Sequence, residues 1–171
     1  MAYKIISLVD GSTKSCDLVN LSQSLSLNCE VLREVDGSHE AVGFVSHETL
    51  VFFSVEFADY ALLNYTKKKS PEAEVCIALT RKWLENHDSV SNKELRVAAY
   101  AANAANAAYA AAHAAYAANA ADAADAARAA AYYAVYAAAD AAYAAGDDEK
   151  KREAELIRQG QFIVGYLRAG T

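Results

Sequence analysis

Apolar residues recur at helical spacing through much of the chain beyond residue 45. The tripeptide Ser-Pro-Glu at 70–72 has the order of a helix start, with a hydroxyl cap, a proline in the first turn and an acid. Ser91 and Glu94 have the spacing of a capping box, in which each side chain bonds the other residue's amide. The pattern therefore predicts helices over 48–65, from 71 to about 86, and from about 91 onward.

The stretch from Ala98 to Ala145 is the most unusual part of the chain. Alanine fills all but sixteen of its forty-eight positions, and alanine is the best helix former. One straight helix of this length would measure about 70 Å, whereas a compact chain of this size has a radius of gyration of about 15–16 Å. We therefore predict a break near 119–125, although the sequence leaves open whether the stretch is one helix or two.

Small alanine side chains let helix axes approach closely, and the tyrosines between them supply apolar surface to fill the gaps. The same Tyr, Asn, Asp and His side chains also suit a binding groove, and the two interpretations are compatible. Gly146 ends the stretch, and a last helix is expected from Asp147 or Asp148 to about Leu167. We predict a mostly α fold: a compact antiparallel helical bundle with tightly packed alanine-rich helices and a small β-containing segment at the N-terminus.

The first forty-five residues have a different pattern. Residues 3–9 and 41–45 are predicted as short strands, and Asp-Gly-Ser occurs at 10–12 and again at 36–38 as a turn signal. The Ser- and Asn-rich range 18–27 between them carries leucines that fit either a helix or a strand. The predicted organisation is thus an N-terminal segment, 1–45, with short strands and Asp-Gly-Ser turns, followed by an alanine-rich helical domain, 46–171.

Charge and cysteine content narrow the class of protein. The net charge is −6 and the sequence pI is about 5.2, which argues against a nucleic-acid binder with a broad basic surface. The three cysteines form no CxxC pair, and no signal-peptide core follows Met1. Acids such as Asp122 and Asp125 would each cost about 2.5–3.5 kcal/mol near a bilayer centre. A cytoplasmic protein without a membrane span is expected.

No motif in the sequence specifies a reaction. His113, Asp122, Asp125 and Asp140 share one segment, but without the Glu-x-x-His or His-Glu-x-x-His spacing of carboxylate-bridged or zinc sites. Gly-x-Ser-x-Gly, the phosphate-binding loop and Gly-x-Gly-x-x-Gly are all missing from the sequence. We therefore predict no catalytic residue, no metal ligand and no cofactor, and we expect that the protein is not an enzyme.

The order of the helical segments provides a family resemblance. The hexapeptide Arg-Lys-Trp-Leu-Glu-Asn at 81–86 ends one predicted helix, and the capped start at 91–94 leads into Ala-Ala-x repeats with Tyr, Asn, His and Asp. Over about residues 48–168 this order resembles the immunity protein family of the Imm-5-like type, found in bacterial and phage genomes. The resemblance implies an all-helical protein that neutralises a toxin, and it carries over no catalytic residue. Residues 1–45 lie outside it, and we interpret them as a variable module that reads the partner.

We therefore expect a non-enzymatic binding protein that blocks a toxin or host-defence protein by occlusion. The acidic balance fits a basic partner, because complementary charge steers association. The expected partner-binding residues share one helix face and are Asp122, Asp125, Tyr132, Tyr136, Asp140 and Tyr143. Two alternatives stay open. One is a helical protein that binds a nucleotide-like small molecule in a pocket lined by Tyr, Asn and His113, and the other is a self-assembling homo-oligomer.

Overall fold

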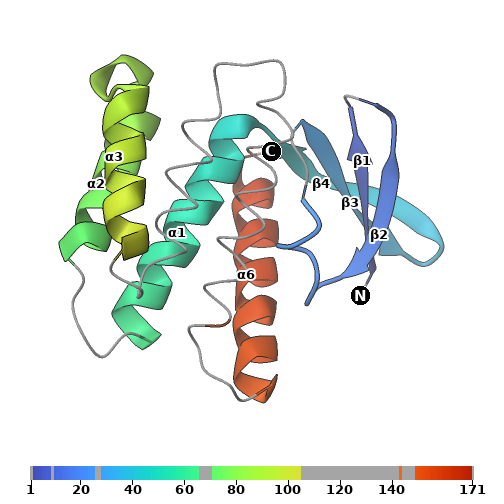
Figure 1. The fold of residues 1–171 in the computed structure, drawn as a ribbon. Coiled ribbons are helices and arrows are strands. Elements are labelled where there is room, and N and C mark those ends of the chain that lie inside the picture. The colour runs from blue at the N-terminus through green and yellow to red at the C-terminus, as the bar shows by residue number, and fades with distance from the viewer. Residues whose placement is uncertain are drawn as a thin grey trace.

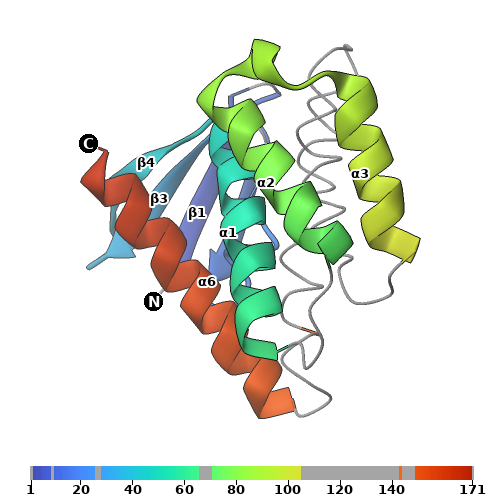
Figure 2. The ribbon, with the colours of Figure 1, turned by 90° about the vertical axis from the view of Figure 1, so that its left-hand side faces the viewer.

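The fold places a β-sheet beside a group of helices. The computed structural model of the chain describes residues 2–8, 10–25, 28–65, 71–104, 143 and 149–170. Helices α1 (His47–Tyr65) and α6 (Glu149–Ala169) lie on one face of a four-stranded sheet (Figure 1). Helices α2 (Pro71–Glu85) and α3 (Asn92–Ala104) lie on the far side of α1 from the sheet (Figures 1 and 2).

All neighbouring strands of the sheet are antiparallel, in the order β2-β1-β3-β4. The strands are β1 (Ala2–Ser7), β2 (Thr13–Asp17), β3 (Cys29–Val35) and β4 (Ser38–Val45). Asp36 and Gly37 alone connect β3 to β4, and their φ angles of 49° and 78° are both positive, as a tight two-residue hairpin requires. Both Asp-Gly-Ser turns predicted from the sequence therefore lie at strand ends, which confirms them.

The predicted mostly α, all-alpha bundle is wrong, because the chain folds as a mixed fold of an antiparallel sheet and helices. The sequence analysis found β1 and part of β4 but not β2 or β3. Strand β3 lies between β1 and β4 and pairs with both, so the sheet depends on it. Its pairing with β1 joins residues more than twenty positions apart, such as Tyr3 with Arg33, and local periodicity carries no signal for such contacts.

The helix starts predicted from capping signals are confirmed. Helix α2 begins at Pro71, and α3 begins directly after Ser91. The amide of Ser91 donates to Glu94 Oε2 at 2.9 Å, and the amide of Glu94 donates to Ser91 Oγ at 3.3 Å, which is the reciprocal capping box. A short 3-10 helix, η1 (His87–Ser89), links α2 to α3. The chain is helical to Ala104, and the predicted break near 119–125 lies outside the described residues.

Aromatic rings fasten α1 to α6. Phe53 of α1 contacts Phe162 and Tyr166 of α6 with ring centroids 6.0 and 5.4 Å apart, both edge to face. Phe52 lies 4.7 Å from Tyr166, and Phe57 lies 6.0 Å from Phe162. Such pairs each contribute about 0.5–1.5 kcal/mol beyond the area they bury. One hydrophobic core joins these rings to the inward side chains of the sheet.

Glycines allow α6 to approach the N-terminal part of the chain closely. A Cβ on Gly43 of β4 would lie 2.8 Å from the Cβ of Leu167, and a Cβ on Gly160 would overlap the carbonyl oxygen of Leu18. Both positions therefore need a residue without a side chain.

None of the helices in the described ranges combines the length and the apolar character needed to cross a bilayer.

Helix α6 also carries a partly buried ion pair. Both carboxylate oxygens of Glu155, which is 1% exposed, accept hydrogen bonds from the guanidinium of Arg158 at 2.6 and 2.8 Å. Gln159 donates a third at 3.1 Å. On its other side, the Arg158 guanidinium lies 3.6 Å from the ring centroid of Tyr60 in α1. Burial of this charge is compatible with stability because the carboxylate keeps several donors.

Candidate protein-binding surface

Most of the partner-binding residues predicted from the sequence lie outside the described residues. These are Asp122, Asp125, Tyr132, Tyr136 and Asp140. The sixth, Tyr143, is helical and 66% exposed, and the Arg152 guanidinium lies 5.4 Å from its ring centroid. The structure therefore does not test whether these six residues form one face.

The two faces of the sheet have very different surroundings. Side chains alternate between faces along a strand, and in β1 Tyr3, Ile5 and Ser7 are buried toward the helices. Lys4 and Ile6 point the other way and are half-buried. None of the described helices lies on that second side (Figures 1 and 2). We call it the outer face; it comprises Ala2, Lys4, Ile6, Thr13, Ser15, Asp17, Glu30, Leu32, Glu34, His39, Ala41 and Phe44.

Apolar side chains run across the outer face in register. Ile6 pairs with Glu30, and Glu30 pairs with Phe44, so one row across three strands has a carboxylate between two apolar residues. The next row contains Lys4 and Leu32, which also pair directly. Phe44 is 47% exposed and Leu8, just beyond the end of β1, is 55% exposed. Contiguous exposed apolar side chains mark interaction surfaces, and Phe44 lies in the same row of the sheet as Ile6.

The outer face also carries two carboxylates on its central strand β3. Glu30 and Glu34 are exposed and point to the same side of β3, with Leu32 between them. Among the residues that the structure describes, neither carboxylate forms an ion pair, although Lys4 lies on the same face. By contrast, Glu40 at the sheet margin accepts a hydrogen bond from Arg33 at 2.7 Å.

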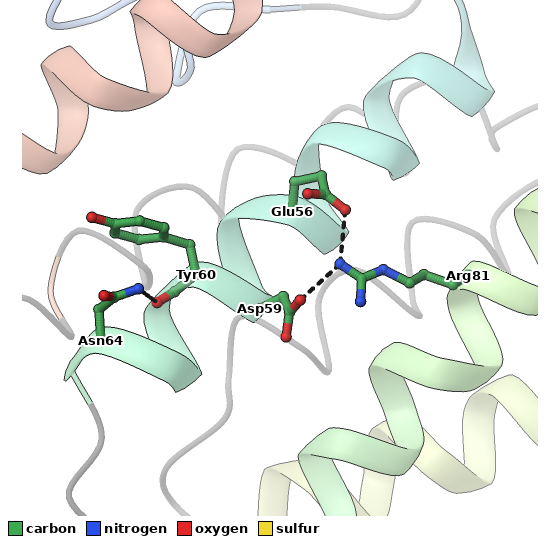
Figure 3. Close-up of polar contacts among 5 residues, drawn as sticks. All are labelled: Glu56, Asp59, Tyr60, Asn64 and Arg81. Atoms are coloured by element: carbon green, nitrogen blue, oxygen red, sulfur yellow. Dashed lines mark hydrogen bonds and ion pairs between the residues drawn. The ribbon is translucent and has the colours of Figure 1, made fainter.

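A second charged region joins α1 to α2. The Arg81 guanidinium of α2 donates to Glu56 at 2.8 Å and to Asp59 at 2.7 Å, both on α1 (Figure 3). Hydrogen bonds and the charge of the two carboxylates outweigh partial burial and raise the pKa of Arg81. Figure 3 also shows Asn64 donating to the carbonyl of Tyr60, at 2.8 Å. These groups form ion pairs and hydrogen bonds with one another, so we interpret the region as a structural contact between α1 and α2.

Shallow hollows on the helical side are lined by both charged and apolar residues. One of about 400 Å³ lies beside Arg81 and is lined by Asp59, Glu74, Ile77, Ala78, Arg81, Lys82 and Glu85. Another of about 500 Å³ lies at the α2–α3 junction, where His87 stacks on Trp83 with ring centroids 4.2 Å apart. Small-molecule sites are usually lined by apolar side chains. His113, which the small-molecule alternative requires, lies outside the described residues.

The described residues contain no group of three or more His, Cys, Asp or Glu side chains that could hold a metal ion. The three cysteines form no disulfide; Cys29 and Cys76 are buried, and Cys16 is half-buried. Burial raises the pKa of the Cys76 thiol to about 12, and burial also raises the pKa of Cys16. A raised pKa keeps a thiol protonated and poorly nucleophilic.

Comparison of the chain with protein-family models, curated proteins and solved structures gives no match. The resemblance to immunity proteins therefore stays a prediction. The outer face was not predicted from the sequence, although part of its residue pattern is visible there. Lys4 and Ile6 alternate with Tyr3 and Ile5 in the first predicted strand, and Phe44 occurs in the second. The face emerges only when the unpredicted β3 places Glu30 between Ile6 and Phe44.

Proposed function

We propose that this chain is a non-enzymatic binding protein that blocks a protein partner by occlusion, as an immunity protein or a phage-encoded inhibitor would. One observation carries the proposal. The outer face presents Phe44 in register with Ile6 on the side of the sheet away from the helices, while the inner face supplies the core. An exposed aromatic side chain among apolar neighbours is the usual anchor of a protein interface.

Occlusion suits the geometry of this face. The strands provide a rigid, hydrogen-bonded platform, so their backbone loses little entropy when a partner docks. The face also spans all four strands and thus offers a broad contact instead of a narrow pocket. A broad, rigid contact of this kind inhibits an enzyme by covering its active site without any reaction of its own.

Paired variants test the proposal. Phe44→Glu adds a charge to the outer face, whereas Val97→Glu changes an apolar residue of α3 that is 60% exposed. Tagged wild-type protein and both variants would be used for affinity capture from cells of the native host, after circular dichroism has shown that each variant is folded. The captured partner would then be purified and its Kd measured.

We expect wild type and Val97→Glu to retain one stoichiometric partner and Phe44→Glu to bind it at least about 30-fold more weakly, the effect of losing a hot-spot residue. Equal binding by Phe44→Glu would show that the partner uses another surface. An absence of any protein partner for the wild type would contradict the proposed function itself.

A further inference from the structure

The outer face has a charge pattern that any occupant must match. Glu30 and Glu34 lie four residues apart on the same side of β3, about 13 Å from each other along an extended strand. Leu32 lies between them, and Ile6 and Phe44 flank Glu30 on the neighbouring strands. Lys4 is the only Lys or Arg among the twelve outer-face residues.

This pattern argues against three kinds of occupant. A second copy docked face to face would add its own Glu30 and Glu34 to an interface with one lysine from each chain, and unbalanced like charges at an interface cost several kcal/mol. Nucleic acid and anionic membrane surfaces present phosphates, which the same carboxylates repel. A polypeptide with lysine or arginine beside apolar side chains is the occupant that both the charge and the apolar rows accept.

We propose that the outer face recognises a basic polypeptide segment, with cationic side chains paired to Glu30 and Glu34 and an apolar side chain seated over Leu32. This inference rests on the proposed function and defines the chemistry of its partner. An extended segment that alternates cationic and apolar residues on one side repeats at the spacing of β3 itself. The net charge of −6 over the whole chain adds long-range attraction for such a partner.

The test uses a defined peptide as the probe. A twelve-residue synthetic peptide that repeats Lys-Ser-Leu-Ser places lysines four residues apart with a leucine between them. It would be titrated into isotope-labelled full-length protein, and amide chemical shifts would give both the location of binding and the Kd. The same peptide with glutamate in place of lysine serves as the charge-reversed probe.

The matched variants are Glu30→Gln/Glu34→Gln on the outer face and Glu74→Gln/Glu85→Gln on the exposed side of α2. Both remove two negative charges, so they change the net charge equally. An exposed ion pair strengthens binding by up to about fivefold. We therefore expect the outer-face variant to raise the Kd of the lysine peptide about tenfold and the α2 variant to change it less than twofold.

The outcomes separate this inference from the proposed function. Shifts confined to β1, β3 and β4, lost with the glutamate peptide and with added salt, support it. Shifts located on the helices, or equal losses in both double variants, overturn it. If Phe44→Glu abolishes capture of the native partner while Glu30→Gln/Glu34→Gln leaves it unchanged, the binding function stands and the basic-partner inference fails. Concentration-dependent dimerisation that Phe44→Glu removes would identify a second copy as the occupant and also overturn it.

Discussion

Two glycines of the same helix illustrate how strongly a single residue depends on its surroundings. In α6, a Cβ on Gly160 would overlap the backbone of Leu18, whereas a Cβ on Gly165 would meet no atom within 4 Å. The backbone oxygen of Leu18 has little room to move, because the turn that follows β2 is itself buried at Leu21 and Leu25. A helix-breaking residue is therefore kept at position 160 for close packing.

Alanine substitutions at positions 160 and 165 should change the free energy of unfolding in opposite directions. Gly160→Ala is expected to lower the free energy of unfolding by about 1–3 kcal/mol, because the new methyl group forces α6 away from Leu18. Gly165→Ala is expected to raise it by up to about 1 kcal/mol, because alanine favours the helix. Urea denaturation of both variants measures the difference. A harmless Gly160→Ala would show that α6 does not pack against the segment after β2.

The buried thiol of Cys76 makes the free energy of unfolding depend on pH in the alkaline range. Burial raises the pKa of its thiol from 9.0 to about 12, so between these values the unfolded chain loses a proton that the folded chain keeps. The folded state is therefore favoured below pH 9 and loses that advantage as the pH rises toward 12. Cys76→Val removes the thiol at nearly constant size.

We expect the stability of the wild type relative to Cys76→Val to fall by about 1.4 kcal/mol per pH unit above pH 9. Denaturation curves of both proteins from pH 8 upward provide the comparison, which cancels the lysines and tyrosines that titrate in the same range. Parallel curves for the two proteins would mean that the Cys76 thiol is open to solvent.

At the scale of elements, the sequence predicts helices better than strands for a physical reason. The capping box at Ser91 and Glu94 and the proline at position 71 act within one helical turn, so a local pattern reveals them. Strand β3 is stabilised by ladders to β1 and β4, and its own residues, Cys29–Val35, alternate poorly between apolar and polar. The local pattern therefore predicted the helices and β1 but not β3, the other central strand of the sheet.

The ion pair between Glu155 and Arg158 allows a prediction of how substitutions in α6 change the free energy of unfolding. Arg158→Ala should lower the free energy of unfolding by about 3 kcal/mol, since it leaves the buried Glu155 carboxylate without its cation. Lys151→Ala, at an exposed position of the same helix, should change it by less than about 0.5 kcal/mol. Thermal unfolding of both variants measures this, and equal losses would show that Glu155 is solvated in the native state.

At the scale of the whole molecule, the sheet buries one face under α1 and α6, and no helix of the described residues covers its outer face. We interpreted residues 1–45 as the module that reads the partner because they lie outside the family resemblance, and the outer face belongs to that range. The individual residues of the outer face could not be predicted from the sequence, because Glu30 and Phe44 become neighbours only through strand pairing. The proposed contacts at 122–143 stay a prediction that concerns mainly residues outside the described ranges.

Hydroxyl-radical footprinting of side chains, detected by mass spectrometry, tests whether the outer face is the surface that binds the partner. In the free protein, Phe44 and Leu8 should react readily and the buried Phe53 and Phe57 should not. When the captured partner is added, we expect Phe44 and Leu8 to lose reactivity. The exposed Val75 on α2 and Val97 on α3 should keep theirs. Protection of Val75 and Val97 with Phe44 still reactive would contradict this expectation and would assign the interface to the helices.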